Sequence, residues 1–264
     1  MNRGRTASIV SALALAASFA LARLHPFGDA GLYAAKFVDA QIMGSAQAPA
    51  EVRAILAEKC ADCHSNRTRA PFYGHFAPVS WLMEHDIVEA RRAMNLSQWD
   101  TYSADRQQTL AAKIVQQMRS HQMPPLQYRI IHWNARITDA DTRIVSLWAH
   151  GPQAMQSDAV VTTIGDPARG KELFEKRCIG CHALTHDHEG PRLQGVYGRT
   201  SGTVAGFAYS PALKKAHIVW DDNSLDKWLT DPDVFIPGNN MDFLVSKPQD
   251  RRDLIGYLRQ SSGK

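Results

Sequence analysis

The sequence predicts an all-α protein, with two small helical modules that carry long ordered loops and follow an N-terminal apolar segment. Apolar residues recur at helical spacing in several short stretches of the 264-residue chain. No stretch alternates apolar and polar residues between turn signals over a length that indicates a sheet. Hydrophobic residues make up 44% and charged residues 21%, a balance that supports packed cores rather than disorder.

The first 22 residues have the layout of a secretory signal peptide. Arg3 and Arg5 precede an uncharged apolar run from Ala7 to Ala22, and Ala20-Leu21-Ala22 has the small-x-small pattern of a cleavage site. The run is shorter than the roughly 20 residues of a typical transmembrane helix. An uncleaved anchor over residues 7–24 is the alternative. The sequence therefore predicts export to the periplasm, with the protein either soluble or attached to the cytoplasmic membrane by residues 7–24.

A connector and a first module follow this segment. The connector, residues 23–48, is rich in alanine and has a weak helical pattern at Leu32, Tyr33, Phe37 and Ile42. The first module covers residues 49–150. It has helical periodicity over residues 52–59, 110–118 and 144–148, and proline and glycine predict a loop over 71–78.

A linker and a second module complete the chain. Residues 151–164 contain Gly, Pro, Gln and Ser without a period and are predicted to be the linker. The second module, 165–264, opens with a helical pattern at Leu173 and Phe174 and closes with another over 254–258. The whole chain has a formal charge of only +4 and no polybasic block, which argues against a nucleic-acid-binding protein.

All four cysteines belong to two copies of one motif, Cys-x-x-Cys-His. The copies are Cys60-Ala61-Asp62-Cys63-His64 and Cys178-Ile179-Gly180-Cys181-His182. Two thiols one helical turn apart can form thioethers to the two vinyl groups of one porphyrin, and the adjacent histidine can bind the iron. A zinc site needs four ligands, a thioredoxin-like site needs a βαβ unit, and a disulfide leaves the repeated histidine unexplained. The sequence predicts two covalently bound haem c groups, with His64 and His182 as axial ligands.

Residues 165–264 resemble class I cytochrome c of the mitochondrial type. The resemblance is collinear over about 100 residues. It is carried by Gly-Asp-Pro-Ala-Arg-Gly-Lys-Glu-Leu-Phe before the second motif and by Glu189–Leu193, Gly195–Arg199, Gly206–Tyr209, Ile218–Trp220, Ile236–Met241 and Asp253–Leu258 after it.

This resemblance implies a set of roles in the second module. Met241 is the second axial ligand, opposite His182, and the Pro191 carbonyl lies behind the His182 ring. Arg199, Tyr209 and Trp220 hydrogen-bond near the haem propionates, and Gly170 and Phe174 pack against the last helix near Leu254 and Tyr257. The chain departs from the family at two positions, with Trp228 in place of a tyrosine under the haem and Asn239 in place of a threonine.

Residues 50–150 resemble a bacterial haem-binding domain found in exported cytochromes. The resemblance is carried by His64-Ser65-Asn66, Pro78-Val79-Ser80-Trp81, Asn95-Leu96-Ser97-Gln98-Trp99 and Met123-Pro124-Pro125. Trp81 and Trp99 pack either against the haem or elsewhere in the core.

Met123 is the candidate for the second ligand of the first haem. It stands before two prolines, which stiffen the backbone. It also follows His64 at the same separation, 59 residues, that places Met241 after His182. His121, His75, His85 and an open site are the alternatives, while His132 and His150 are expected to be surface or structural residues.

Two haems with closed iron sites predict an electron carrier, not an enzyme. A peroxidase-like dihaem enzyme needs an open distal position and an acid–base group beside it. A haem subunit or sensor of a larger respiratory complex is the other alternative. The methionine loop lacks a lysine-rich rim, since Asp233, Asn239, Asn240 and Asp242 occur there, so steering toward an acidic partner is expected to be weak. Donor and acceptor are redox proteins that the sequence does not identify.

Overall fold

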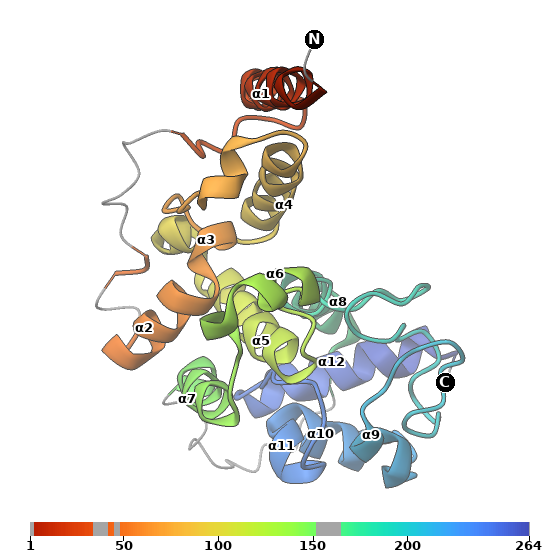
Figure 1. Ribbon diagram of the computed structural model, residues 1–264. Helices are drawn as coiled ribbons and strands as arrows, with labels where there is room; N and C mark the ends of the chain where they lie inside the picture. The colour runs from red at the N-terminus through yellow and green to blue at the C-terminus, as the bar shows by residue number, and fades with distance from the viewer. Residues whose placement is uncertain (1–2, 34–41, 45–47, 152–164, 264) are drawn as a thin grey trace. The chain divides into compact units, whose positions relative to one another are not determined.

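The computed structural model describes residues 3–33, 42–44, 48–151 and 165–263 (Figure 1). These residues form helices and loops, with no strand among them beyond an isolated antiparallel bridge between Thr200 and Val219. The predicted all-α class is therefore confirmed. Most of the expected linker, residues 152–164, and the Phe37 part of the connector lie outside the described residues.

The chain divides into two compact units that do not coincide with the two modules expected from the sequence. Unit 1 comprises Met1–Thr101 and His132–Arg136, and unit 2 comprises Tyr102–Ile131 and Ile137–Lys264. Two helices expected in the first module, over 110–118 and 144–148, therefore belong to unit 2. Side chains of both contact the C-terminal part of the chain: Lys113 pairs with Glu189, and Ser146 donates to Asp242.

Unit 1 is built from helical segments of three to 19 residues. They are α1 (Arg3–Leu21), α2 (Ala50–Lys59), α3 (Ala61–His64), η2 (Phe72–His75), α4 (Val79–Ala93), η3 (Leu96–Thr101) and η4 (Trp133–Ala135). α1 is joined to the rest by Ser18, whose Oγ donates to Ala77 O at 2.6 Å, and by Trp81, whose Nε1 donates to Leu21 O at 3.1 Å. Over the described residues, no helix has both the length and the apolar character needed to cross a membrane.

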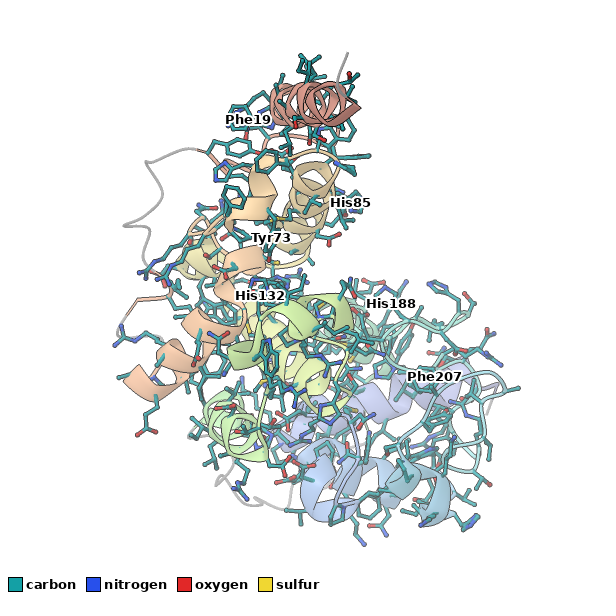
Figure 2. All side chains as sticks on the ribbon, in the orientation of Figure 1. Phe19, Tyr73, His85, His132, His188 and Phe207 are labelled. Atoms are coloured by element: carbon teal, nitrogen blue, oxygen red, sulfur yellow. The ribbon has the colours of Figure 1, made fainter. Side chains whose placement is uncertain are left out.

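The 15-residue helix α4 has no clear apolar period in the sequence. Its buried residues are Ser80, Glu84 and Ile87, so two of the three are polar. Ile87 packs in a small core with Ala30 and Leu32. The short segment η4 joins this unit through Tyr73, whose hydroxyl lies 3.2 Å from His132 Nε2; both residues are labelled in Figure 2.

Unit 2 contains the remaining helices. They are α5 (Ala104–Arg119), α6 (Leu126–Ile131), α7 (Asp139–His150), α8 (Pro167–Arg177), α9 (Pro211–Ala216), α10 (Asp222–Thr230), α11 (Pro232–Phe235) and α12 (Pro248–Ser261). α8 packs closely against α12. Only glycine fits at position 170, because a Cβ there would lie 1.9 Å from Asp253 O. The Phe174 and Tyr257 rings are 5.5 Å apart, so the contact that the resemblance implied is present.

Helix α5 packs against both α7 and α8 (Figure 1). Its apolar face is buried through Leu110, Ala111, Ile114, Val115 and Met118. Ion pairs reinforce this packing, since Arg177 Nε lies 2.9 Å from Asp105 Oδ1 and Lys113 Nζ lies 2.7 Å from Glu189 Oε1. α5 thus forms one wall of unit 2.

Candidate haem sites

Unit 2 contains a cavity of about 520 Å³ that collects the residues predicted for the second haem. Apolar and aromatic side chains form most of its wall. The predicted site residues that line it are Cys178, Cys181, His182, Pro191, Arg199, Tyr209, Trp220, Trp228 and Met241. Side chains on one face of α5, including Ala112 and Gln116, also line the cavity.

The two thiols of this site lie on one turn at the end of α8. The His182 N–H donates to Cys178 O at 2.8 Å, which closes the turn. Burial raises the pKa of Cys178 to about 12 and also raises the pKa of Cys181, so both groups are neutral thiols in this pocket. None of the four cysteines, all of which lie in described segments, forms a disulfide. The thiols are therefore free to be attached to a porphyrin.

The imidazole of His182 is oriented by the Pro191 carbonyl, as the resemblance implied. His182 Nδ1 lies 2.8 Å from Pro191 O. A carbonyl can only accept, so Nδ1 carries the proton and Nε2 keeps its lone pair for a metal. Burial lowers the pKa of His182, against the opposing effect of the Pro191 hydrogen bond, and so favours the neutral ring.

Gly190 allows the loop to approach this ring. A Cβ at position 190 would lie 2.2 Å from His182 Cε1 and 2.5 Å from Nδ1. The Gly190 N–H also donates to Cys181 O at 2.7 Å, which fixes the loop to the motif. A glycine is thus required where the chain passes the imidazole.

Met241 lines the same cavity and is held by Asn239. The Met241 N–H donates to Asn239 Oδ1 at 2.7 Å. The buried Asn239 side chain in turn donates to Ile236 O and to Asp233 Oδ1, each at 3.0 Å. An amide can accept from Met241 and donate to Asp233 at once, which gives the departure from threonine at this position a structural role.

The cavity also has a polar part. Arg199 donates to Gln194 O at 3.2 Å and to Arg192 O at 3.0 Å, and its burial lowers the pKa of the guanidinium. Burial raises the pKa of Tyr209, and Arg199 opposes that shift. Trp220 and Trp228 lie next to each other, with ring centroids 5.4 Å apart. A guanidinium and a phenol in this pocket suit the carboxylates of a porphyrin.

The donor set of this cavity fits haem c. Cys178 and Cys181 would hold the porphyrin, His182 Nε2 and the Met241 thioether would bind iron, and the aromatic wall would cover the ring. The predicted hydrogen bonds of Arg199, Tyr209 and Trp220 to propionates stay predictions.

The first motif lies in unit 1, where Cys60 ends α2 and the other four residues form α3. The His64 N–H donates to Cys60 O at 3.0 Å, the same closure as in the second motif. Burial raises the pKa of Cys60 to about 12 and that of Cys63 to about 11. The two cysteine pairs therefore have matching backbone turns and matching neutral thiols.

His64 has a backbone partner that the sequence did not reveal. Its Nδ1 lies 3.2 Å from Met94 O, at the end of α4. Burial lowers the pKa of His64, although this hydrogen bond raises it. Met94 O thus corresponds to Pro191 O, and Nε2 of His64 keeps its lone pair for iron.

The sequence signatures of the first module surround this motif. Asn95 Nδ2 donates to Asn66 Oδ1 at 2.9 Å, and the Asn66 N–H donates to Ser97 Oγ at 3.1 Å. Arg91 on α4 donates to Ser65 O at 2.8 Å and to Thr68 Oγ1 at 3.0 Å. The Ser-Asn pair after His64 and the later Asn-x-Ser segment are therefore partners. Their position beside Met94 is a signal that could have pointed to its carbonyl.

The candidate second ligands of the first haem fall in both units. Met123 and His121 belong to unit 2, and Met123 is 44% exposed. His75 and His85 belong to unit 1 with His64; His75 lies 5.2 Å from the Tyr33 ring, and the Phe27 ring meets His85 edge-on at 5.6 Å. The structure does not bring Met123 and His64 together within one unit, so this ligation stays a prediction.

Three of the four residues that stand around Met241 in place of a lysine-rich rim are held by internal contacts. Asp242 and Asn239 are buried, and the Asp233 carboxylate pairs with Arg119. These side chains support the methionine loop from within.

Comparison with known proteins agrees with this geometry. A haem-binding domain family matches residues 33–151, and the cytochrome c family matches residues 167–262. Cytochrome c of Euglena viridis is 50% identical over 98 residues, which are 36% of this chain and 96% of the relative. Cytochrome c of Chlamydomonas reinhardtii is 44% identical over 102 residues, 37% of this chain and 91% of the relative.

A solved structure is also similar. Cytochrome cH from Methylobacterium extorquens is 40% identical and matches 36% of this chain and 99% of its own, with a TM-score of 0.35. The extent and identity of the sequence matches decide the family. The chain belongs to the cytochrome c family, as a haem-binding electron carrier whose cytochrome c domain follows a separate haem-binding domain.

Proposed function

We propose that this chain is an exported dihaem cytochrome c that passes single electrons between redox protein partners outside the cytoplasmic membrane. The observation that carries the proposal is the unit 2 cavity, which holds two thiols, a histidine with a free Nε2 and a methionine. Bound haem c supplies a one-electron iron couple. The chain's own residues orient the ligands and exclude water from the ring.

The position of Met241 favours a carrier over an enzyme. Bound to the iron, the Met241 thioether would fill the coordination position that a peroxide or diatomic ligand would need. Outer-sphere transfer needs only a haem edge close to the surface and ligands that stay in place when the iron changes charge. The hydrogen bonds of His182 to Pro191 and of Met241 to Asn239 supply that rigidity.

The likeness of the two motifs favours a second haem. Both have a closed Cys-to-His turn, buried neutral thiols and a backbone carbonyl at histidine Nδ1. Both lie in regions matched by haem-binding families. We therefore assign one covalent haem to each motif.

Haem content tests this proposal directly. The full chain, produced with haem-attachment machinery, should show a mass increase of two haems that survives denaturation. Cys60→Ala with Cys63→Ala should remove one haem, and Cys178→Ala with Cys181→Ala the other. A redox titration should then show two reversible one-electron steps. A single haem that only one cysteine pair controls would contradict the dihaem proposal.

Location and partners complete the proposal. The apolar segment 7–22 after Arg3 and Arg5 supports export, since c-type haem is attached outside the cytoplasm. A near-neutral chain, with formal charge +4, is expected to meet its partners with little salt dependence. Fractionation should find the haem protein in the periplasm or on the outer face of the cytoplasmic membrane. A haem-free cytoplasmic protein as the normal state would contradict export.

A further inference from the structure

Asp242, the residue after Met241, is a fully buried carboxylate with three donors around it. Arg119 Nη2 and His150 Nε2 each lie 2.9 Å from Asp242 Oδ1, and Ser146 Oγ donates to the same oxygen at 3.1 Å. The Asp242 side chain is 0% exposed. A buried carboxylate requires such partners, because an unpaired charge in a dry interior is strongly disfavoured.

A second set of hydrogen bonds connects Arg119 to Met241 through Asp233 and Asn239. Arg119 Nη1 donates to Asp233 Oδ1 at 2.9 Å and Nη2 to Asp233 Oδ2 at 2.6 Å. Asp233 accepts from Asn239, whose Oδ1 accepts the Met241 N–H. One guanidinium is thus connected to the methionine loop through Asp242 on one side and through Asp233 and Asn239 on the other.

The donors come from outside the cytochrome c match. Arg119 lies on α5, and Ser146 and His150 lie on α7, whereas the family matches residues 167–262. All three belong to unit 2 together with the loop that they contact. His150, Asp233 and Asp242 are also a set of metal-ligand types, but the Arg119 guanidinium already pairs with both carboxylates.

We propose that Arg119, Ser146 and His150 form a clamp on the Met241 loop and act as positioning residues for the methionine ligand of the second haem. The inference rests on the proposed ligation by Met241. The loop can carry its sulfur away from the iron only if Asp242 and Asn239 move with it, which breaks the hydrogen bonds of the clamp. The clamp therefore lowers the population of the open state, in which the Met241 sulfur is not bound to iron.

Carbon monoxide binding to the reduced full-length holoprotein measures this population. The gas reaches iron only when Met241 is off, so its binding rate scales with the open fraction. Met241→Ala identifies the signal of the second haem, because it should open that haem permanently. Arg119→Ala should raise the rate at the second haem about tenfold, which corresponds to about 1.4 kcal/mol. His150→Ala and Ser146→Ala, which each remove one donor to Asp242, should give smaller increases.

Lys113→Ala is the matched control. Lys113 is also on α5 and also forms an ion pair with the C-terminal part, but its partner is Glu189, which is not among the hydrogen-bonded residues of the clamp. Its removal should leave the carbon monoxide rate unchanged. Arg119→Lys, which keeps a charge but not the fork of donors, should restore part of the slow binding. If Arg119→Ala fails to retain haem, the carbon monoxide binding rates of His150→Ala and Ser146→Ala test the clamp instead.

The outcomes separate this inference from the proposed function. A wild-type rate in the clamp variants, with fast binding in Met241→Ala, would overturn the clamp and leave the ligation intact. Fast binding in the unmutated protein that Met241→Ala does not change would overturn the ligation itself. Equal acceleration by Lys113→Ala and Arg119→Ala would show a general effect of α5 packing and would also overturn the clamp.

Discussion

The two Cys-x-x-Cys-His motifs have the same five-residue pattern but different surroundings. The second motif opens into a cavity that also contains Met241, so both predicted iron ligands belong to unit 2. The first motif lies in unit 1, while Met123 lies in unit 2 and is 44% exposed. The pentapeptide therefore specifies the attachment side of a haem, whereas the opposite side depends on distant parts of the chain.

The two attachment sides, which are the cysteine pairs with His64 and His182, have nearly the same physical chemistry. His182 donates to Pro191 O at 2.8 Å and His64 to Met94 O at 3.2 Å. The first carbonyl comes from a loop nine residues after its histidine and the second from the end of a helix 30 residues away. Two unrelated segments thus supply one function, the orientation of a neutral imidazole.

The largest expected effect comes from opening the second haem. Met241→Ala removes the thioether from the cavity, so reduced protein should change from very slow to fast carbon monoxide binding, by about a hundredfold or more. The potential of this haem should fall, since methionine ligation raises it. Flash photolysis and redox titration measure the two effects. Unchanged rates and potentials would show that Met241 is not a ligand.

Met123→Ala tests the other half of the comparison. If the sulfur of Met123 binds the first haem, this variant should open that haem and leave the second unchanged. The same two measurements apply, with Met241→Ala as the reference for the other haem. Fast binding by the unmutated protein that Met123→Ala leaves unaffected would show an open first haem. That outcome would favour an enzyme or a sensor over a carrier.

Gly190→Ala should damage the second site alone. The new Cβ would lie 2.2 Å from His182 Cε1, so the loop or the ring must move and the bond to Pro191 O must lengthen. We expect a loss of about 1–3 kcal/mol in unfolding free energy, the usual cost of overpacking. Denaturant unfolding followed by haem absorbance measures it. An equal perturbation of the first haem would contradict the independence of the two attachment sides.

The local elements of this chain follow from its sequence more readily than the packing does. Helices at 52–59 and 254–258 have clear apolar periods and are present. Helix α4 was not predicted, because its buried face contains Ser80 and Glu84. Polar residues on a buried face remove the period from which a helix is predicted.

The site shows the same division. Motif and resemblance together predicted the residues that meet in the unit 2 cavity. They did not predict Met94 O, because a backbone carbonyl has no sequence signature of its own. They placed α5 and α7 in the first module, as the match of the haem-binding family to residues 33–151 also does, but nothing in the apolar periods shows that Arg119 and His150 contact Asp242. Pairings between distant charges depend on tertiary packing.

Asn95→Ala should weaken the first site by a smaller amount. It removes the hydrogen bond to Asn66 Oδ1 and the acceptor of the Ser97 N–H, both close to the carbonyl that orients His64. Because Asn95 is buried, we expect a loss of about 1–2 kcal/mol in unfolding free energy. Gln98→Ala, an exposed position on the following segment η3, is the matched control. Equal losses in both variants would show that the Asn66–Asn95 contact contributes nothing specific.

The smallest expected effect is a pH dependence specific to unit 2. The hydrogen bond that His150 donates to Asp242 raises the pKa of His150 in the folded state, against the opposing effect of burial. A group with a raised folded pKa stabilises the fold fully below its unfolded pKa, about 6.5, and loses that contribution as the pH rises through the folded value. His150→Gln keeps a donor but does not titrate. The difference in unfolding free energy between wild type and His150→Gln should therefore be largest at acid pH and should shrink toward alkaline pH. A wild-type-minus-His150→Gln difference that stays constant with pH would show that His150 does not carry the charge that Asp242 stabilises.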